Sequence, residues 1–283
     1  MTEKELRCLV EQAKRDSRVY EGLIQLWNQR AKLQRQLSDC ESGGGEELQL
    51  ILSEDFAGNK VTSPYLEHFC SIPEAYNEAG MEHFITCMGK SVGHYYAPEG
   101  TNESTPWEVI CYSSSVLAAT GQEEFSELCI EWQEYFTSGY PWPTSGQKMI
   151  RWFYDHSSHP ESKKSAEFAC LNSNANLQAA VYQGQSDMWF QNSGESHPLD
   201  RWVTWRVWLK LNTPGNADGL FWVYKDGEVL LGEEGLRLKD DADPRGYNAW
   251  WIGGNYSNLP GGTMTHSGSR YVTGIKWYNT WPD

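Results

Sequence analysis

The feature that most constrains the fold of this chain is an alternation of apolar and polar residues that begins near residue 46. A period of two is typical of β-strands, whose successive side chains point to opposite faces of a sheet. Turn signals interrupt the alternation, and the pair Asp226-Gly227 favours a two-residue hairpin. The expected strands are 48–54, 83–88, 108–118, 127–136, 147–154, 177–183, 187–191, 202–211, 219–225, 228–232, 248–253 and 270–278. Many short strands and few helices predict an all-β sandwich of two sheets, with a helical or irregular insertion at 64–80.

The first 41 residues follow a different pattern, which predicts a helical arm. Residues 3–38 contain neither Gly nor Pro and are rich in residues that favour helices. In one heptad frame, seven of the ten a and d positions are apolar. This spacing favours a coiled coil or a helix docked on a partner, and the alternative is an amphipathic helix that packs on its own domain. We expect the arm to join copies of the chain into a homo-oligomer, with a trimer favoured.

A run of glycines separates the two patterns. The segment 41–46 reads Glu-Ser-Gly-Gly-Gly-Glu, a composition typical of flexible linkers. The net charge changes at the same place, since residues 1–45 carry +1 and the remainder carries −16. We therefore expect a helical arm over 1–41, a linker over 42–47 and a β domain over 48–283.

The acidic composition excludes one large class of partners. A net charge of −15 leaves no basic stripe that could release counterions from a nucleic acid, so no nucleic-acid partner is expected. The same charge argues mildly against a polyanionic ligand, unless the site is locally basic. No apolar run approaches the length of a membrane span, and the first residues show no signal-peptide core. We expect synthesis in the cytoplasm, no membrane partner and no export by the general secretory route.

The cysteines and histidines do not predict a metal centre. There are seven cysteines, an odd number, and no pair has CxxC spacing, so neither a disulfide framework nor a zinc site is expected. Most are expected to be buried thiols, and Cys129 lies within an expected strand. Asp240, Asp241 and Asp243 could form a Ca²⁺ loop, although a solvated polar turn is the more common outcome. No other cofactor is expected.

Aromatic residues point to a ligand class. The chain has 14 tryptophans, and flat aromatic rings serve as stacking platforms on sugar-binding surfaces. The alternation within 127–136 places three polar or aromatic side chains on one face of a strand, which suits hydrogen bonding to a glycan. The candidate glycan-binding residues are Glu131, Gln133, Tyr135, Trp152, Tyr154 and Trp208. We expect about half of them to face solvent and the others to be core.

One part of the sequence resembles a known family. Residues 202–219 read WVTWRVWLKLNTPGNADG, residues 220–227 read LFWVYKDG, and residues 271–277 read YVTGIKW. This combination resembles the jelly-roll polysaccharide lyases that act on alginate and glucuronan, and related lectin-like domains. The likeness covers roughly residues 125–280 and implies a concanavalin-like jelly-roll β-sandwich. Alternation in the first stretch predicts a core face made of Val203, Trp205, Val207, Leu209 and Leu211.

The resemblance also implies a candidate chemistry. These lyases cleave uronate-containing glycans by β-elimination, which requires a base for the C5 proton, a cation for the carboxylate and an acid for the leaving oxygen. Lys148 matches the family's strand lysine, and Tyr182 matches one member of a Tyr-x-Tyr pair. The other member of that pair is replaced by Ala180, so one phenol is missing. Arg206 or Arg151 would supply the cation, and the candidate catalytic set is Lys148, Tyr182 and Arg206.

A retaining glycosidase is a second enzymatic alternative. Such an enzyme needs two carboxylates roughly 5 Å apart. Glu127 and Glu131 share one face of an expected strand, with Cys129 between them in the chain. Solvated or hydrogen-bonding glutamates are the more common outcome of this pattern.

The order of segments suggests a biological setting. An N-terminal helix, a glycine linker and a lectin-like sandwich without a signal peptide are typical of virion fibres and decoration proteins. The leading interpretation is therefore a virion-associated, glycan-recognising adhesin or fibre protein, whose partners are a polysaccharide or cell-surface glycan and a capsid or tail protein. The alternative is an active polysaccharide lyase that cleaves uronate-containing glycans.

Overall fold

A computed structural model describes most of the expected β domain, within the unit Leu48–Asp283. The described residues are 50–64, 66–70, 84–97, 107–111, 113–122, 124–140, 142, 147–153, 165–171, 176–183, 186–239, 246–253, 268–279 and 281. The expected arm over 1–41, the linker over 42–47 and the aspartates at 240–243 lie outside these residues, so each stays a prediction.

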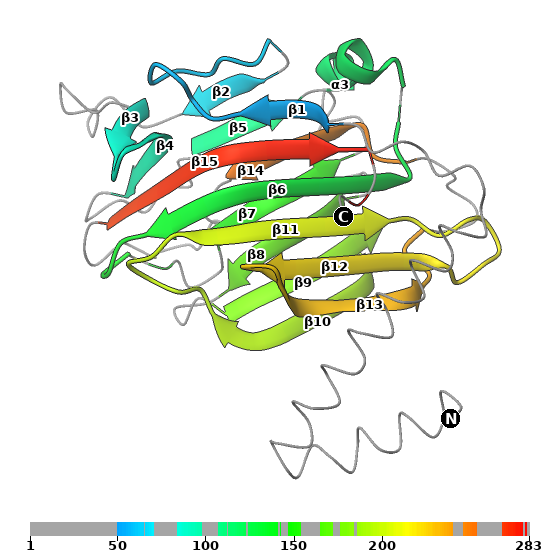
Figure 1. Ribbon diagram of the computed structural model, residues 1–283. Coiled ribbons are helices and arrows are strands. Elements are labelled where there is room, and N and C mark those ends of the chain that lie inside the picture. The colour runs from blue at the N-terminus through cyan, green and yellow to red at the C-terminus, as the bar shows by residue number, and fades with distance from the viewer. Residues whose placement is uncertain are drawn as a thin grey trace. The chain divides into compact units, whose positions relative to one another are not determined.

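The first of two antiparallel sheets, sheet A, faces the viewer in Figure 1. Its middle is formed by β11, β6 and β15, which come from distant parts of the chain. In spatial order the strands are β13 (Glu228–Leu236), β12 (Gly219–Lys225), β11 (Val203–Lys210), β6 (Glu127–Phe136), β15 (Gly268–Tyr278), β4 (Lys90–Ala97) and β3 (Phe84–Cys87). A further strand, β1 (Leu50–Glu54), pairs with the C-terminal end of β15.

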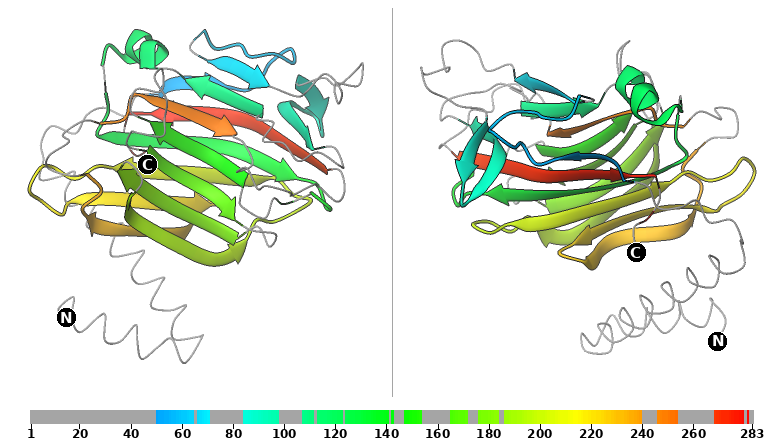
Figure 2. Two further views of the ribbon diagram at one scale, coloured as in Figure 1. Left: turned by 180° about the vertical axis from the view of Figure 1, so that it is seen from behind. Right: turned by 45° about the horizontal axis from the view of Figure 1, so that its top comes forward.

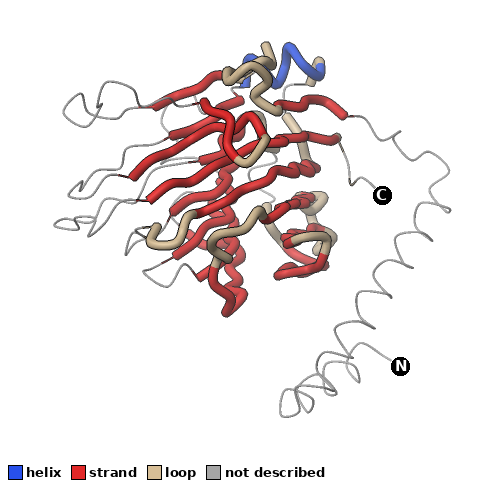
Figure 3. Tube along the Cα trace, turned by 60° about the vertical axis from the view of Figure 1, so that its left-hand side comes forward, coloured by secondary structure: helices blue, strands red, loops and turns tan. Residues whose placement is uncertain are grey.

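The second sheet, sheet B, lies behind sheet A in Figure 1 and faces the viewer in the left view of Figure 2. In spatial order its strands are β10 (Ser186–Ser196), β9 (Asn176–Gln183), β8 (Ser165–Leu171), β7 (Gln147–Phe153), β14 (Ala249–Gly253), β5 (Trp107–Cys111) and β2 (Glu67–Cys70). The helix α3 (Ser113–Thr120) follows β5 and stands out among the strands in Figure 3. Within the described ranges, no helix is long and apolar enough to cross a membrane.

The two packed sheets confirm the predicted all-β sandwich. The expected strands 127–136 and 219–225 coincide with β6 and β12. The sequence does not predict β4 or β8, and β2 forms within 64–80, where an insertion is expected. The alternation therefore identifies the middle of sheet A better than the outlying strands.

The prediction of one continuous strand over 108–118 is wrong. The strand β5 ends at Cys111, and α3 begins at Ser113. Serine favours a helix N-terminus because its hydroxyl can accept a hydrogen bond from an unpaired backbone N–H, and the Leu-Ala-Ala sequence favours the helix interior. The helix stops before Gly121, which has a left-handed φ of +73° and whose N–H donates to the Leu117 carbonyl oxygen at 2.8 Å.

Indole rings dominate the core between the sheets. Rings from the two sheets meet edge to face, with centroid separations of 5.1 Å for Phe168 and Trp205 and 6.1 Å for Trp250 and Trp277. The fully buried tryptophans are Trp132, Trp152, Trp205, Trp250 and Trp277. The predicted core face of β11 is buried throughout, which confirms the alternation there. Cys129 is a buried free thiol, as predicted.

A charged cluster is enclosed in this core. Glu134 of β6 and Arg270 of β15 are both buried and form an ion pair, in which Arg270 Nε donates to Glu134 Oε1. Arg270 Nη1 also donates to the carbonyl oxygen of Lys148 in β7 at 3.3 Å, so one side chain links the two sheets. His197 Nε2 lies 3.8 Å from Glu134 Oε2. Burial raises the pKa of Glu134, and the Arg270 guanidinium opposes that effect.

Candidate functional site

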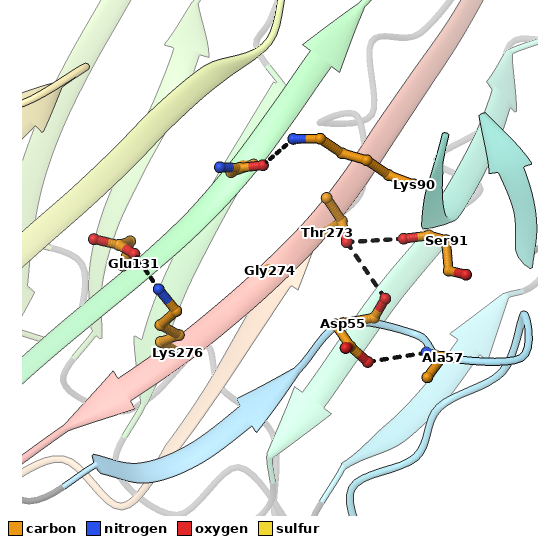
Figure 4. A pocket seen from close by; sticks show the side chains of 9 residues that line it. Asp55, Ala57, Lys90, Ser91, Glu131, Thr273, Gly274 and Lys276 are labelled. Atoms are coloured by element: carbon orange, nitrogen blue, oxygen red, sulfur yellow. Dashed lines mark hydrogen bonds and ion pairs between the residues drawn. The ribbon is translucent and has the colours of Figure 1, made fainter. Parts of the chain in front are cut away.

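The outer face of sheet A carries two adjoining hollows, which together we call the groove. Their volumes are about 350 Å³ and about 360 Å³, sizes within the range of ligand pockets. They share Glu131 of β6. The first hollow is lined by Asp55, Ala57, Lys90, Ser91, Glu131, Gln133, Thr273, Gly274 and Lys276 (Figure 4). The second is lined by Glu131, Thr204, Arg206, Tyr224, Asp226, Gly227 and Trp281.

A β-bulge in β15 determines which side chains reach the first hollow. Thr273 pairs with Gln133 of β6, whereas Lys276 pairs with Glu131, so β15 contains one extra residue at this point. Gly274, within the bulge, has a φ of +62°, a left-handed conformation that favours glycine. The extra residue places Thr273 and Lys276 on the same face of the sheet, although regular alternation would separate them.

Glu131 lies at the centre of the groove between two cations. Arg206 Nε donates to Glu131 Oε2 at 3.0 Å, and Lys276 Nζ donates to Glu131 Oε1 at 3.0 Å. The Glu131 side chain is only 12% exposed. Burial raises its pKa, but the hydrogen bonds from Arg206 and Lys276 outweigh burial and hold the pKa below its ordinary value. Glu131 is therefore a carboxylate at neutral pH.

Aromatic rings line one end of the groove. The ring centroids of Trp281 and Tyr224 lie 4.5 Å apart, and those of Trp281 and Trp208 lie 5.3 Å apart. The guanidinium carbon of Arg206 lies 5.0 Å from the centre of the Trp281 ring. Trp281 is partly exposed above the buried Trp208, so its ring is held in place by neighbours on the face of the sheet.

A second group of rings borders the other end of the groove. Lys90 Nζ donates to Gln133 Oε1 and lies 4.7 Å from the centre of the Trp202 ring. The Trp202 ring is 5.6 Å from that of Tyr135, which is 5.9 Å from that of Tyr271. All three rings are partly exposed. The groove therefore has hydrogen-bonding side chains along its middle and aromatic rings at both ends.

Comparison with known proteins identifies the architecture. No protein-family model matches the sequence, and no curated protein matches it. The structure is similar to the endo-β-1,4-glucuronan lyase of the fungus Trichoderma reesei, with a TM-score of 0.54 at 9% identity over 81% of this chain and 95% of that chain. It is also similar to the alginate lyase of Aplysia kurodai, with a TM-score of 0.55 at 11% identity over 81% of this chain and 98% of that chain. The alginate lyase vAL-1 from Chlorella virus matches with a TM-score of 0.50 at 11% identity, over 69% and 87% of the two chains.

The domain has the jelly-roll fold of these lyases. At identities of 9–11% the likeness establishes the fold, and the chemistry of this jelly roll has to be judged from its own side chains.

The jelly roll does not bring the predicted catalytic set together. Lys148 lies on β7 and Tyr182 on β9, both in sheet B, whereas Arg206 lies on β11 in sheet A. In the register of sheet B, Lys148 lines up with Gln178 of β9, which is four residues from Tyr182. The backbones of Lys148 and Tyr182 are therefore about 13 Å apart along the strand direction and two strands apart across the sheet. Alternation predicts the face of a strand but does not show which sheet the strand joins.

The alternative cation, Arg151, is in sheet B and already has an acidic partner. Its Nε lies 3.3 Å from Glu167 Oε2, and its guanidinium carbon lies 4.7 Å from the Phe153 ring and 5.6 Å from the Trp251 ring. In the register of sheet B, Glu167 stands between Arg151 and Ala180. A carboxylate at this position would repel the uronate that a lyase has to bind.

The glycosidase alternative fails on distance. Glu127 and Glu131 are four residues apart on β6, which separates their backbones by about 13 Å, far more than a retaining pair of carboxylates allows. Glu127 Oε1 accepts a hydrogen bond from Trp208 Nε1 at 2.9 Å, while Glu131 binds Arg206 and Lys276. The two carboxylates therefore belong to different local networks.

The six predicted glycan-binding residues fall in different places. Three of them lie on the outer face of β6, as the alternation predicts, namely Glu131, Gln133 and Tyr135. Trp208 is on the same side of sheet A but only 6% exposed, packed with Trp281. Including Trp152 is wrong, because its side chain points between the sheets and is fully buried. Tyr154 lies outside the described residues.

Sequence reasoning missed most of the residues that line the groove, and Lys276, Lys90 and Trp281 show why. Lys276 faces it because of the bulge, for which Gly274 inside a strand pattern was the available signal. Lys90 begins β4, a strand that the alternation does not predict. Trp281 follows the last strand, where no periodicity indicates which way a side chain points.

Proposed function

We propose that this chain binds a glycan in the groove on the outer face of sheet A and does not cleave it. The observation that carries the proposal is the arrangement of the groove, with partly exposed aromatic rings at both ends and charged and amide side chains between them. Sugars present apolar ring faces and polar edges, which such a surface can contact together. The glucuronan and alginate lyases among the similar structures support a glycan as the ligand class.

The proposal includes a setting that rests on sequence pattern alone. The heptad spacing of the expected arm over 1–41 and the glycine run at 43–45 support an adhesin or fibre protein of virion type, in which the arm anchors and oligomerises the chain. Several copies of one groove on an oligomer would raise the avidity for a surface that displays many identical glycans. Weak binding by a single groove is therefore compatible with this role.

Binding is tested with the full chain on an array of neutral and acidic glycans. Wild type should retain a defined group of glycans, and Trp281→Ala should weaken that binding about tenfold, because it removes a ring of the groove. Phe190→Ala is the matched control, since Phe190 is 50% exposed on β10 of the other sheet. The proposal fails if wild type binds no glycan, or if both variants lose binding equally.

Cleavage is tested separately on alginate and glucuronan. Elimination produces an unsaturated uronate that absorbs in the near ultraviolet. We expect no such signal from wild type, since Arg206 lies on a different sheet from Lys148 and Tyr182. A steady rise in absorbance with wild type that disappears in Lys148→Ala would make the lyase the correct function.

A further inference from the structure

The charges that line the groove cancel. Its two hollows contain three cationic side chains, Lys90, Arg206 and Lys276. They also contain three carboxylates, Asp55, Glu131 and Asp226. The groove is therefore formally neutral, although the chain as a whole carries a net charge of −15.

Two of the three cations in the groove already share one carboxylate, and the third donates to a neutral amide. Glu131 accepts hydrogen bonds from both Arg206 and Lys276, and Lys90 donates to the Gln133 amide oxygen. Asp226 accepts hydrogen bonds from Arg201 Nη1 at 2.7 Å and from a backbone N–H. An anionic ligand would have to compete with Glu131 for the same two cations, and its own charge would lie beside that carboxylate.

A sugar hydroxyl meets no such obstacle. A hydroxyl group both donates and accepts, so it can donate to an oxygen of Glu131 and accept from Lys276 without a change in the charge of the groove. An ammonium has three donors and a carboxylate has about four acceptor positions, so the ion pair leaves hydrogen-bonding capacity on both partners. The pair is therefore a ready-made binding site for vicinal hydroxyls.

We infer that the groove selects uncharged glycans over acidic ones and that Glu131 determines this specificity. The inference rests on the proposed function, because it names the chemical class of the glycan bound there. Glu131 acts by pairing with Arg206 and Lys276, two of the three cations of the groove, which would otherwise attract a uronate or sulfate group. Its replacement by a neutral residue would leave both cations without the carboxylate that now neutralises them.

The test compares neutral and acidic glycans on the same array, followed by titration calorimetry with two matched pairs. Cellohexaose is paired with the β-1,4-glucuronic acid hexamer, and mannohexaose with the mannuronic acid hexamer, so that within each pair only oxidation at C6 differs. Wild type should bind neutral glycans at least about tenfold more tightly than acidic ones. Glu131→Gln should bind acidic glycans at least about tenfold more tightly than wild type does, and that gain should weaken as salt is added.

The control is Glu233→Gln, which changes the net charge by the same amount at an exposed position on β13 that lines neither hollow. It should keep the wild-type preference, and circular dichroism should show that both variants are folded. If wild type binds acidic glycans as tightly as neutral ones, or Glu131→Gln gains no more than the control, the specificity inference is wrong and the proposed function stands. If wild type binds no glycan on the array, both are wrong.

Discussion

At the scale of single residues, His197 shows how surroundings fix a protonation state. Its Nδ1 donates to the Pro198 carbonyl oxygen at 2.6 Å, and its ring lies 4.5 Å from Phe136 and 5.3 Å from Trp205. Burial lowers its pKa to about 3, against the opposing effect of the Pro198 hydrogen bond, and the nearby Arg270 lowers it further. The folded protein therefore holds this imidazole neutral across the pH range in which an ordinary histidine takes up its proton.

This neutrality predicts a loss of stability in acid. A histidine in the unfolded chain takes up a proton below its ordinary pKa of 6.5, whereas His197 in the folded state does not until about 3. The unfolded state binds more protons between these values, so the free energy of unfolding should decrease as the pH falls, by up to about 1.4 kcal/mol per pH unit. His197→Phe keeps the aromatic packing and should show a shallower decline in urea titrations across this range. Parallel curves for the two proteins would contradict the assignment.

At the scale of elements, the Glu134–Arg270 pair joins β6 to β15 and reaches β7 of the other sheet. Glu134→Gln leaves the Arg270 guanidinium buried without an acidic partner, a change that costs roughly 3–5 kcal/mol when a buried pair is broken. Urea unfolding should show this loss for the full chain. The comparison variant is Arg201→Ala, which breaks an exposed pair with Asp226 and should cost about 1 kcal/mol or less. Equal effects of the two substitutions would mean that the buried pair does not hold the strands together.

The sequence pattern predicts some strands and their faces, but it does not predict which residues lie side by side. The sequence predicts β6 and β12 at their observed limits for different reasons. In β6, core-facing and outward-facing side chains alternate, whereas β12 is a short apolar run that ends before the Asp226-Gly227 turn and is buried on both faces.

The alternation misassigns 113–118, because the serines that begin this segment and the alanines within it decide its structure rather than its apolar residues. It places Glu131 on an outer face, yet it does not show that Lys276 lies beside it, because strand pairing joins residues far apart in the chain. The resemblance to lyases groups Lys148 and Arg206 into one candidate set, although they belong to different sheets.

At the scale of the whole molecule, the chain divides into two compact units, Met1–Glu47 and Leu48–Asp283. The indole core and the buried Glu134–Arg270 pair both lie within the second unit. Together with the glycine run at 43–45, this predicts that residues 46–283 fold by themselves. The shortened chain should keep its β signal in circular dichroism and unfold in one cooperative transition in urea. An aggregated or molten product would show that the boundary is wrong.

The bulge in β15 bears on how this groove could arise in evolution. A point substitution changes a side chain but leaves it on the same face, so no substitution alone could carry Lys276 from the core side of the strand to the groove. The insertion of one residue moves every later side chain of the strand to the opposite face of the sheet. After the bulge, Ile275 and Trp277 therefore point into the core, and Lys276 between them points into the groove. Among relatives with this jelly roll, the groove should therefore track the presence of an extra residue near Gly274. In an alignment, a gap at that position would be more informative about ligand binding than the identity of any residue around it.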